Sequence, residues 1–553
     1  MIEVIYLLAL VFVLSSIFLF IFHKAFKLTI PAYIIAGIIG GLFLGEEALL
    51  ELVKWGIVFV VFIFGAKLEP DKLKHGIGGS LFSVAIQVAG LGIGSFAVLY
   101  FTGFSTLDAV FVSAAVVFSS SLTGTELVEK YATVELLYGR LAEATDVIHD
   151  VLAICLILLL SPILFNVNLG YTITVAGGML AVCLAIRKFL FPWIFEICDS
   201  SEELMLLSGI SILALMITIS EMAGLSIVVG AFFAGLTFSR FPYNIELVEN
   251  MESLKDFFAA VFFFSLGALL TMPGLPSLII AAVIILITVF VKPLLTSLSL
   301  MQYGYDKRTA YRCGLTLDQI SEFVLILIIQ AHLVGMISPY VFQGIIIATT
   351  TTMITTAYTD RYSEKIYAWL SKNLPFDAPE KIQRSRTQIS TPLKDHIILV
   401  GYDVQGRKIG EYLRERDEDF VVIEINPEKL EMAEELENYI FKSGTERETW
   451  EMANHKEAKM IISTAPQRNI SERILTLETE AKKVVRSNKF REASELLGEG
   501  ADYVMVPDLL ASEELIDCVQ EVLYGGEGKL EEIRENLLKN LKKDLETLRE
   551  EES

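Results

Sequence analysis

Long apolar stretches separated by short polar loops fill the first 360 residues, and they constrain the fold more than any other feature. About 20 apolar residues in a helix span a bilayer core, where lipid offers no hydrogen-bond partners to the backbone. Thirteen stretches approach this requirement: 4–22, 29–44, 52–66, 79–101, 107–124, 139–161, 170–188, 203–220, 225–238, 256–270, 276–299, 309–332 and 337–358. The sequence therefore predicts an α-helical multi-pass membrane domain over residues 1–375.

Lysine and arginine gather in alternate loops between these stretches, as in 67–74 and 307–312, and are absent from loops such as 102–106 and 333–338. The positive-inside rule then predicts an N-terminus outside and a C-terminus in the cytoplasm. Thirteen spans agree with this, because an odd number of spans places the two termini on opposite sides of the membrane. The first stretch, 5–22, lacks a basic leader and a cleavage site, so we expect a retained span. The expected location is the cell membrane, plasma or inner.

The remaining chain has the composition of a soluble protein. We expect a polar linker over 376–394, a compact domain over 395–525 and a charged helix over 526–553, which is either a solvated helix or a dimer contact. The net charge of −22 argues against nucleic acid as a partner. The five cysteines are scattered and include no CxxC pair, which is typical of a reducing compartment.

Ionisable residues inside the sixth stretch are candidates for function, because a charge in a membrane is costly. Asp146 and Asp150 lie one helical turn apart on one face, with His149 between them. A buried carboxylate can hold a proton or a dehydrated monovalent cation, but not both at once, and this competition is the chemistry that exchange needs. The alternative is a carboxylate that caps a broken helix or pairs with a lysine.

Two polar breaks interrupt other stretches, one in each half of the domain. The first contains the hydroxyl residues Ser119, Ser120, Ser121 and Thr123. The second, 317–323, contains Glu322 and follows a stretch with the lone Lys292, for which Asp150 is the expected ionic partner. One break in each half is what inverted repeats with broken crossover helices produce. Close packing of small residues is the alternative for the first break.

These residues together resemble the cation:proton antiporter family that includes the Kef-type glutathione-gated potassium efflux systems. Ser119–Ser121 is similar to the family's Ser-Ser-Thr, Gly139-Arg140 to its Gly-Arg, and Gln319–Phe323 to its Gln-Gly-Ser-Glu-Phe. His149-Asp150 stands where Kef proteins have Gln-Asp.

The resemblance implies a homodimer whose protomers have a dimerisation part and a rocking, ion-carrying part. It implies that Asp150 carries the cation or proton with Lys292 as its partner, and that the protein takes part in pH homeostasis. One acid after a non-acidic residue implies electroneutral exchange, although Asp146 as a second acid would change the stoichiometry. His149 is either a pH sensor or a neutral substitute for Gln. The choice between K⁺ and Na⁺, glutathione sensitivity and an ancillary regulatory subunit stay open.

The soluble part contains a strand, a glycine turn and a helix over 396–410, followed by a strand that ends in Glu424. Gly401 and Gly406 fit a Rossmann turn, and Glu424 is placed to bind ribose hydroxyls. Asp403 replaces the middle glycine and opposes phosphate. A regulatory adenine nucleotide, AMP or NAD(H), is expected, and a mononucleotide or no nucleotide at all are the alternatives.

This order of motifs also resembles the domain that regulates potassium conductance in Kef, Trk and Ktr systems. In that resemblance Gly444 and Thr445 follow the third strand. No residues for hydride transfer are recognisable, so we expect neither an enzyme nor a required cofactor.

Other functions fit the sequence less well than exchange. A ligand-gated K⁺ channel needs a TVGYG-like filter, and the threonine run 349–352 lacks the glycines. An efflux system without proton coupling stays an alternative. A membrane-bound oxidoreductase needs haem, iron–sulfur or flavin ligands, whose patterns are missing. A sensor that has lost transport would not need Asp150 and Lys292.

Overall fold

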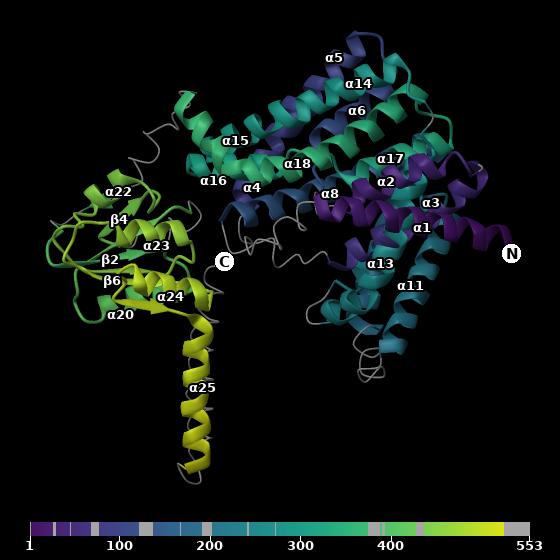
Figure 1. Cartoon of the computed structure of the whole chain (residues 1–553). Helices are drawn as coiled ribbons and strands as arrows, with labels where there is room; N and C mark the ends of the chain where they lie inside the picture. Colours follow the sequence, from purple (N-terminus) through teal and green to yellow (C-terminus); the bar gives the residue numbers. More distant parts are fainter. Residues whose placement is uncertain are drawn as a thin grey trace. The chain divides into compact units, whose positions relative to one another are not determined.

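The computed structural model describes residues 2–25, 29–44, 46–67, 77–120, 137–165, 167–190, 202–239, 243–270, 272–373, 388–389, 393–426 and 436–524. The chain forms two compact units, Met1–Pro379 and Glu380–Ser553, each of which is described by itself. In Figure 1 the first unit, coloured purple to green, is helical, and the second, green to yellow, contains a sheet flanked by helices.

The helices of the first unit are α1 (Ile2–Ala25), α2 (Ile30–Gly40), α3 (Glu46–Lys67), α4 (Ile77–Gln87), α5 (Gly94–Phe101), α6 (Thr106–Val117), α8 (Leu137–Phe165), α9 (Leu169–Ala185), α11 (Glu202–Met222), α12 (Ile227–Thr237), α13 (Tyr243–Ala268), α14 (Leu275–Leu286), α15 (Lys292–Tyr303), α16 (Lys307–Thr316), α17 (Glu322–Leu333) and α18 (Pro339–Asn373). π-helical segments join α4 to α5 (Val88–Ile93) and α14 to α15 (Ile287–Val291), and a third follows α9 (Ile186–Leu190).

Five helices among the described residues are long and apolar enough to cross a membrane: Gly78–Phe101, Leu137–Leu164, Leu169–Phe189, Glu203–Met222 and Leu275–Tyr303. Shorter apolar helices occur at Leu8–Phe22, Ile30–Gly40, Leu52–Ala66, Thr106–Val117, Ile227–Thr237, Asp256–Ala268 and Glu322–Leu333. The number of thirteen spans stays a prediction. The last predicted stretch, 337–358, overlaps α18, which begins at Pro339 and continues to Asn373.

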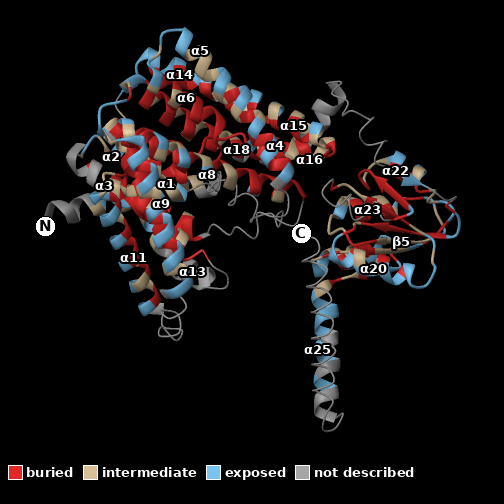
Figure 2. Ribbon diagram, turned by 180° about the vertical axis from the view of Figure 1, so that it is seen from behind, coloured by how far each residue is buried: buried red, intermediate tan, exposed pale blue. Residues whose placement is uncertain are grey.

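The outer surface of the helical unit is apolar. Figure 2 shows exposed positions along α5, α11 and α14, and the residues of these helices are mostly apolar. On α9, for example, Leu180, Val182 and Leu184 are all exposed. A soluble protein rarely exposes such continuous apolar faces, and in a membrane they would face lipid.

Close backbone contact holds two pairs of helices together. A Cβ on Gly235 of α12 would lie 2.0 Å from the carbonyl oxygen of Phe62 on α3. A Cβ on Gly267 of α13 would lie 2.0 Å from the carbonyl oxygen of Ile34 on α2. Glycine is required at these positions because helices in membranes associate through close packing of small residues.

One order of elements occurs twice in the helical unit. A long helix with a central π-helical segment, α4–α5 or α14–α15, is followed by a helix that ends in a polar break, α6 or α16. In the second case Pro293 explains the π-helical segment, because proline has no N–H and crowds the preceding turn. The broken helices predicted from the sequence are confirmed at Val117 and Thr316, where α6 and α16 end.

The second unit contains one seven-stranded sheet with the order β1-β4-β3-β2-β5-β6-β7. Its strands are β1 (Gln388–Ile389), β2 (His396–Val400), β3 (Phe420–Glu424), β4 (Asn438–Phe441), β5 (Ala458–Ser463), β6 (Lys482–Arg486) and β7 (Tyr503–Met505). All neighbouring strands are parallel except β1 and β4. Six strands thus follow the Rossmann order, which confirms the predicted α/β class. Strand β1 lies within the range 376–394 that we predicted to be a linker.

Alternate residues of the central strands supply two cores, because successive side chains of a strand point to opposite faces. Ile398 and Val400 of β2 belong to a core with Trp450, whereas Leu399 packs with Tyr402 and Phe441 on the other face. The sheet is flanked by α20 (Val404–Arg414), α22 (Arg447–Met452), α23 (Arg468–Leu475) and α24 (Phe490–Gly498), whereas α25 (Pro507–Tyr524) follows β7 and extends away from the sheet (Figure 1). The charged segment 526–553 lies outside the described residues.

Candidate functional site

The two polar breaks of the helical unit contact each other. Helix α6 gives way to extended backbone at Phe118, and residues 317–321 separate α16 from α17. Three hydrogen bonds join the breaks: from the Ser321 N–H to the Phe118 carbonyl (3.0 Å), from the Ser119 hydroxyl to the Leu317 carbonyl (3.1 Å) and from the Gln319 side-chain amide to the Ser120 carbonyl (3.0 Å). Among the described residues, the carbonyls of Phe118, Ser120 and Leu317 and the N–H of Ser321 thus find partners in the opposite segment, as burial in a membrane requires.

Helix α8 carries the predicted acids beside this crossing. Asp146 and Asp150 are 4% and 0% exposed, and His149 is also fully buried. The Ser119 N–H donates to Nδ1 of His149 at 3.3 Å. This geometry requires an unprotonated Nδ1 and assigns the proton of a neutral imidazole to Nε2. His149 thus connects α8 to the first break.

Lys292, the first residue of α15, is fully buried, and its ammonium group donates to the carbonyl oxygen of Gln319 at 3.0 Å. Its charge interacts with the carboxylates of Asp146 on α8 and Asp318 in the second break. We expected Asp150 to be its partner, and that pairing stays a prediction. Lys292 is therefore hydrogen-bonded to the second break and interacts electrostatically with the acidic helix.

Glu322 and Asp318 add two more acids to the second break. Glu322 begins α17, where the helix dipole favours an acid, and its charge interacts with Asp146. Asp318 is fully buried and accepts a hydrogen bond from the Thr359 hydroxyl of α18 at 2.8 Å. Asp318 was not among the predicted site residues, although an acid directly before the Gln319–Phe323 motif is a visible signal. Ser121 and Thr123 lie outside the described residues.

A second candidate site lies at the carboxyl ends of the parallel strands. The glycine turn after β2 requires both glycines: Gly401 has φ +90°, and a Cβ on Gly406 would lie 2.0 Å from the Gly401 carbonyl oxygen. Asp403 caps α20, and its carboxylate accepts from the N–H of Val404 at 2.9 Å. The carboxylate therefore occupies the helix start where a dinucleotide fold places pyrophosphate.

Glu424 ends β3 next to this turn. Its carboxylate accepts three backbone hydrogen bonds, from the N–H groups of Tyr402, Ile425 and Asn426, each at 2.8 Å. Tyr402 belongs to the glycine turn, so Glu424 fixes the turn against the neighbouring strand. A carboxylate has about four acceptor positions, so it can still bind ribose hydroxyls.

The remaining predicted residues follow β4. The Gly444 carbonyl accepts from the Trp450 indole at 2.8 Å, and the Thr445 N–H donates to the Ser443 hydroxyl at 3.3 Å. Strands β4, β3 and β2 are parallel neighbours, so all six residues predicted to bind the nucleotide lie at or after the carboxyl ends of adjacent strands. Arg486, at the end of β6, was not among the predicted residues. Its guanidinium donates to the Gln405 side chain (3.2 Å) and to the Thr464 carbonyl (3.3 Å), and adds positive charge at this end of the sheet.

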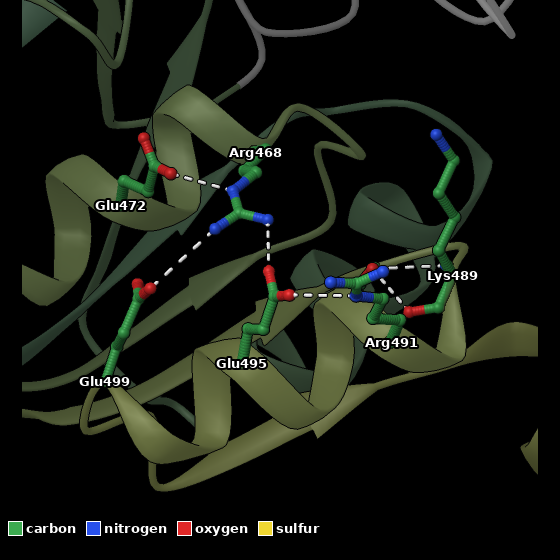
Figure 3. Close-up of polar contacts among 7 residues, drawn as sticks. Arg468, Glu472, Lys489, Arg491, Glu495 and Glu499 are labelled. Atoms are coloured by element: carbon green, nitrogen blue, oxygen red, sulfur yellow. Dashed lines mark hydrogen bonds and ion pairs between the residues drawn. The ribbon is translucent and has the colours of Figure 1, made fainter.

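An exposed ion network lies on α23 and α24 of the same unit (Figure 3). Arg468 contacts Glu472 at 2.7 Å, Glu495 at 2.6 Å and Glu499 at 3.7 Å, and Arg491 also contacts Glu495. The hydrogen bond from Arg468 lowers the pKa of Glu495. All members are solvated, so the network contributes little to stability. Among the described residues, no three His, Cys, Asp or Glu side chains are grouped as metal ligands.

Comparisons with known proteins agree with both units. A family model described as "Sodium/hydrogen exchanger, transmembrane" matches residues 8–360, and a TrkA-N domain model matches residues 397–507. K(+) efflux antiporter 4 of Arabidopsis thaliana is 25% identical over 351 residues, which cover 59% of this chain and 58% of that protein. The putative cation/proton antiporter YbaL of Escherichia coli (strain K12) is 24% identical over 469 residues, 78% of this chain and 82% of that protein.

A solved structure supports the fold of the helical unit. The sodium proton antiporter MjNhaP1 of Methanocaldococcus jannaschii aligns with a TM-score of 0.50 at 18% identity, over 66% of this chain and 98% of that one. At this identity the likeness concerns the fold alone. The chain spans 58% of the length of the plant relative, so similarity does not transfer the activity of the whole plant protein.

Proposed function

The chain belongs to the sodium/hydrogen exchanger family, and we propose on this basis that it exchanges a monovalent cation, K⁺ or Na⁺, for protons across a membrane. The observation that carries the proposal is the burial of Asp146 and Asp150 on α8, the helix that contacts the first break through His149 and interacts with Lys292 through Asp146. Buried acids next to a broken helix are the usual elements of ion sites in secondary transporters.

Exchange follows from competition at these carboxylates. An ionised carboxylate in a buried site is stable only when a cation, an ammonium group or hydrogen bonds compensate it, and a protonated one needs no cation. A cation that binds therefore displaces a proton, and the reverse step completes the cycle. Polar groups at the crossing, such as the Ser119 hydroxyl and the Gln319 amide, supply oxygen atoms near the site.

The stoichiometry that we propose is one cation for one proton. Asp150 follows His149 rather than a second acid, and His149 in the neutral form accepts a hydrogen bond from Ser119. Asp146 is the residue that could alter this ratio, because its carboxylate interacts with the charge of Lys292. We propose Asp150 as the carrier of the cation or proton, with Asp146 as the next candidate.

Regulation is proposed to reside in the TrkA-N domain. The glycine turn at Gly401–Gly406, Glu424 and the nearby Arg486 form a polar edge suited to an adenine nucleotide, AMP or NAD(H). Asp403 disfavours a pyrophosphate at the start of α20, which favours AMP among these. We further propose a homodimer in a cell membrane, with the TrkA-N domain in the cytoplasm.

Proton flux in liposomes loaded with a pH dye tests the transport proposal. We expect K⁺ or Na⁺, added separately, to drive proton movement in the wild type, and Asp150→Asn to lower the flux at least about tenfold. Asp256→Asn removes an exposed acid on α13 and serves as the matched control. If Asp150→Asn retains the flux, Asp146 becomes the proposed carrier. Cation movement without coupled proton flux refutes exchange and favours a channel.

The regulatory proposal has a separate test. Purified full-length protein is titrated with AMP, NADH and NAD⁺, and the flux is measured with and without each compound. We expect binding of at least one of them and a change in flux at saturation. Binding that leaves the flux unchanged contradicts regulation, and the absence of binding by all three contradicts the nucleotide site.

A further inference from the structure

Asp318 lies in the second break, between the end of α16 and the start of α17, and its side chain is fully buried. The Thr359 hydroxyl of α18 donates a hydrogen bond to its carboxylate at 2.8 Å. The residue precedes the Gln319–Phe323 motif that carries the family resemblance, so that resemblance assigns it no role. Its burial and its contact with another helix call for a physical explanation, because a buried ionised carboxylate is costly.

Lys292 supplies that explanation, because its charge interacts with acids that belong to two different elements. Its ammonium group donates to the carbonyl of Gln319, the residue directly after Asp318, at 3.0 Å. The carboxylates of Asp146 and Asp318 both act on this ammonium charge. Asp146 belongs to α8 and Asp318 to the break, so Lys292 can share its charge between two separate elements.

The described buried residues of this region contain more acids than bases. Asp146, Asp150, Asp318 and Glu322 are each at most 4% exposed, and Lys292 is the buried lysine among them. A cation bound to the acids of α8 repels the ammonium group of Lys292. That repulsion is reduced if a second carboxylate holds the ammonium charge while the cation is bound.

We propose that Asp318 is a second carboxylate partner of Lys292, which holds the ammonium charge whenever a cation or proton occupies the acidic face of α8. Asp318 thereby sets the affinity of the site for the cation. It acts through Lys292 and is a positioning residue rather than a ligand of the transported ion. This inference rests on the proposed exchange function and adds to it a determinant of cation affinity.

A merely structural role for Asp318 predicts different behaviour. In that case the carboxylate only anchors α18 to the break through Thr359, and an asparagine, whose amide oxygen also accepts a hydrogen bond, would replace it without loss. Charge therefore separates the two roles, since Asp318→Asn keeps the acceptor and removes the charge, whereas Thr359→Val keeps the charge and removes the donor.

The test measures the apparent KM for K⁺ and Na⁺ and the maximal proton flux of the full-length protein in liposomes. For Asp318→Asn we expect KM to rise about tenfold, equivalent to about 1.4 kcal/mol, with the maximal flux within about twofold of the wild type. Asp318→Glu restores most of the affinity. Thr359→Val raises KM about threefold, because the charge stays but its position is less fixed.

Thr352→Val is the control on the same helix, since the Thr352 hydroxyl donates to the Thr349 carbonyl of α18 itself. A wild-type KM in Asp318→Asn overturns the proposal, as does a loss of maximal flux without a change in KM. If Asp318→Asn does not fold, Thr359→Val decides: an unchanged KM overturns the proposal.

A measurement of cation binding that needs no transport separates a failure of the proposed exchange from a failure of the proposed role of Asp318. Stabilisation of the detergent-solubilised protein against heat is measured as K⁺ or Na⁺ is raised, and gives an apparent affinity that needs no proton coupling. A wild type that is stabilised but moves no protons refutes the exchange function alone. In that case the same shift of about tenfold in Asp318→Asn supports the role of Asp318, and an unshifted titration overturns it.

Discussion

Replacing Glu424 by glutamine tests how strongly the glycine turn of the α/β unit is held. The Glu424 carboxylate accepts from three backbone N–H groups, those of Tyr402, Ile425 and Asn426, at 2.8 Å each. One of its oxygens serves Tyr402, and the other serves Ile425 and Asn426. A glutamine has only one acceptor oxygen, so its NH₂ group would face a donor on one side.

The magnitude follows from the loss of at least one hydrogen bond to a charged group. Such a bond contributes about 1.5–3 kcal/mol, and partial exposure of Glu424 reduces this to about 1–2 kcal/mol. A free energy of that size corresponds to a factor of about 5–30 in the local opening equilibrium. We therefore expect the Tyr402 amide to exchange its hydrogen about 5–30 times faster in Glu424→Gln.

Hydrogen–deuterium exchange of the full-length protein, followed by mass spectrometry on peptides that cover 395–426, measures this effect. Glu478→Gln removes a charge from an exposed position of the same unit and should leave these peptides unchanged. Equal exchange in Glu424→Gln and wild type would refute the reasoning, because the three contacts would then not hold the turn. Faster exchange in Glu478→Gln as well would point to net charge instead.

Two further predictions concern packing and pH. Gly235→Ala places a Cβ 2.0 Å from the Phe62 carbonyl oxygen, so we expect the thermal unfolding midpoint of the protein in detergent to fall. Gly178→Ala is the control, because a Cβ there has no atom within 4 Å, and it should leave the midpoint unchanged. Equal midpoints for the two variants would contradict the close contact of α3 and α12. Burial lowers the pKa of His396 in the folded protein. Below about pH 6.5 the unfolded chain therefore binds more protons than the folded one. The α/β unit should lose stability as the pH falls from about 6.5 through the lowered pKa. Urea unfolding of the full-length protein at several pH values should show a smaller acid loss in His396→Gln than in the control His455→Gln, and equal losses would contradict the assignment.

The family resemblance was predicted from short motifs, and the match of the exchanger family over residues 8–360 confirms it. Local sequence sufficed here because each motif interrupts a regular pattern. Ser119 and Ser120 break an apolar stretch, and α6 does end at Val117. The glycine turn was also predictable, because only glycine adopts the φ of +90° found at Gly401 without strain.

The sequence by itself determined the partition into a membrane domain and an α/β domain, since hydropathy and the alternation of strands and helices are properties of local segments. It also determined that Asp146, Asp150 and Lys292 lie within apolar stretches. The tertiary structure alone decided which acids act on Lys292. Asp318 precedes α17 and Asp146 lies on α8, far apart in the chain, and both act on Lys292 only because α16 packs against both α8 and α15 and ends in the second break. Electrostatic partners inside a membrane are set by distances between helices, and a one-dimensional pattern contains no such distances.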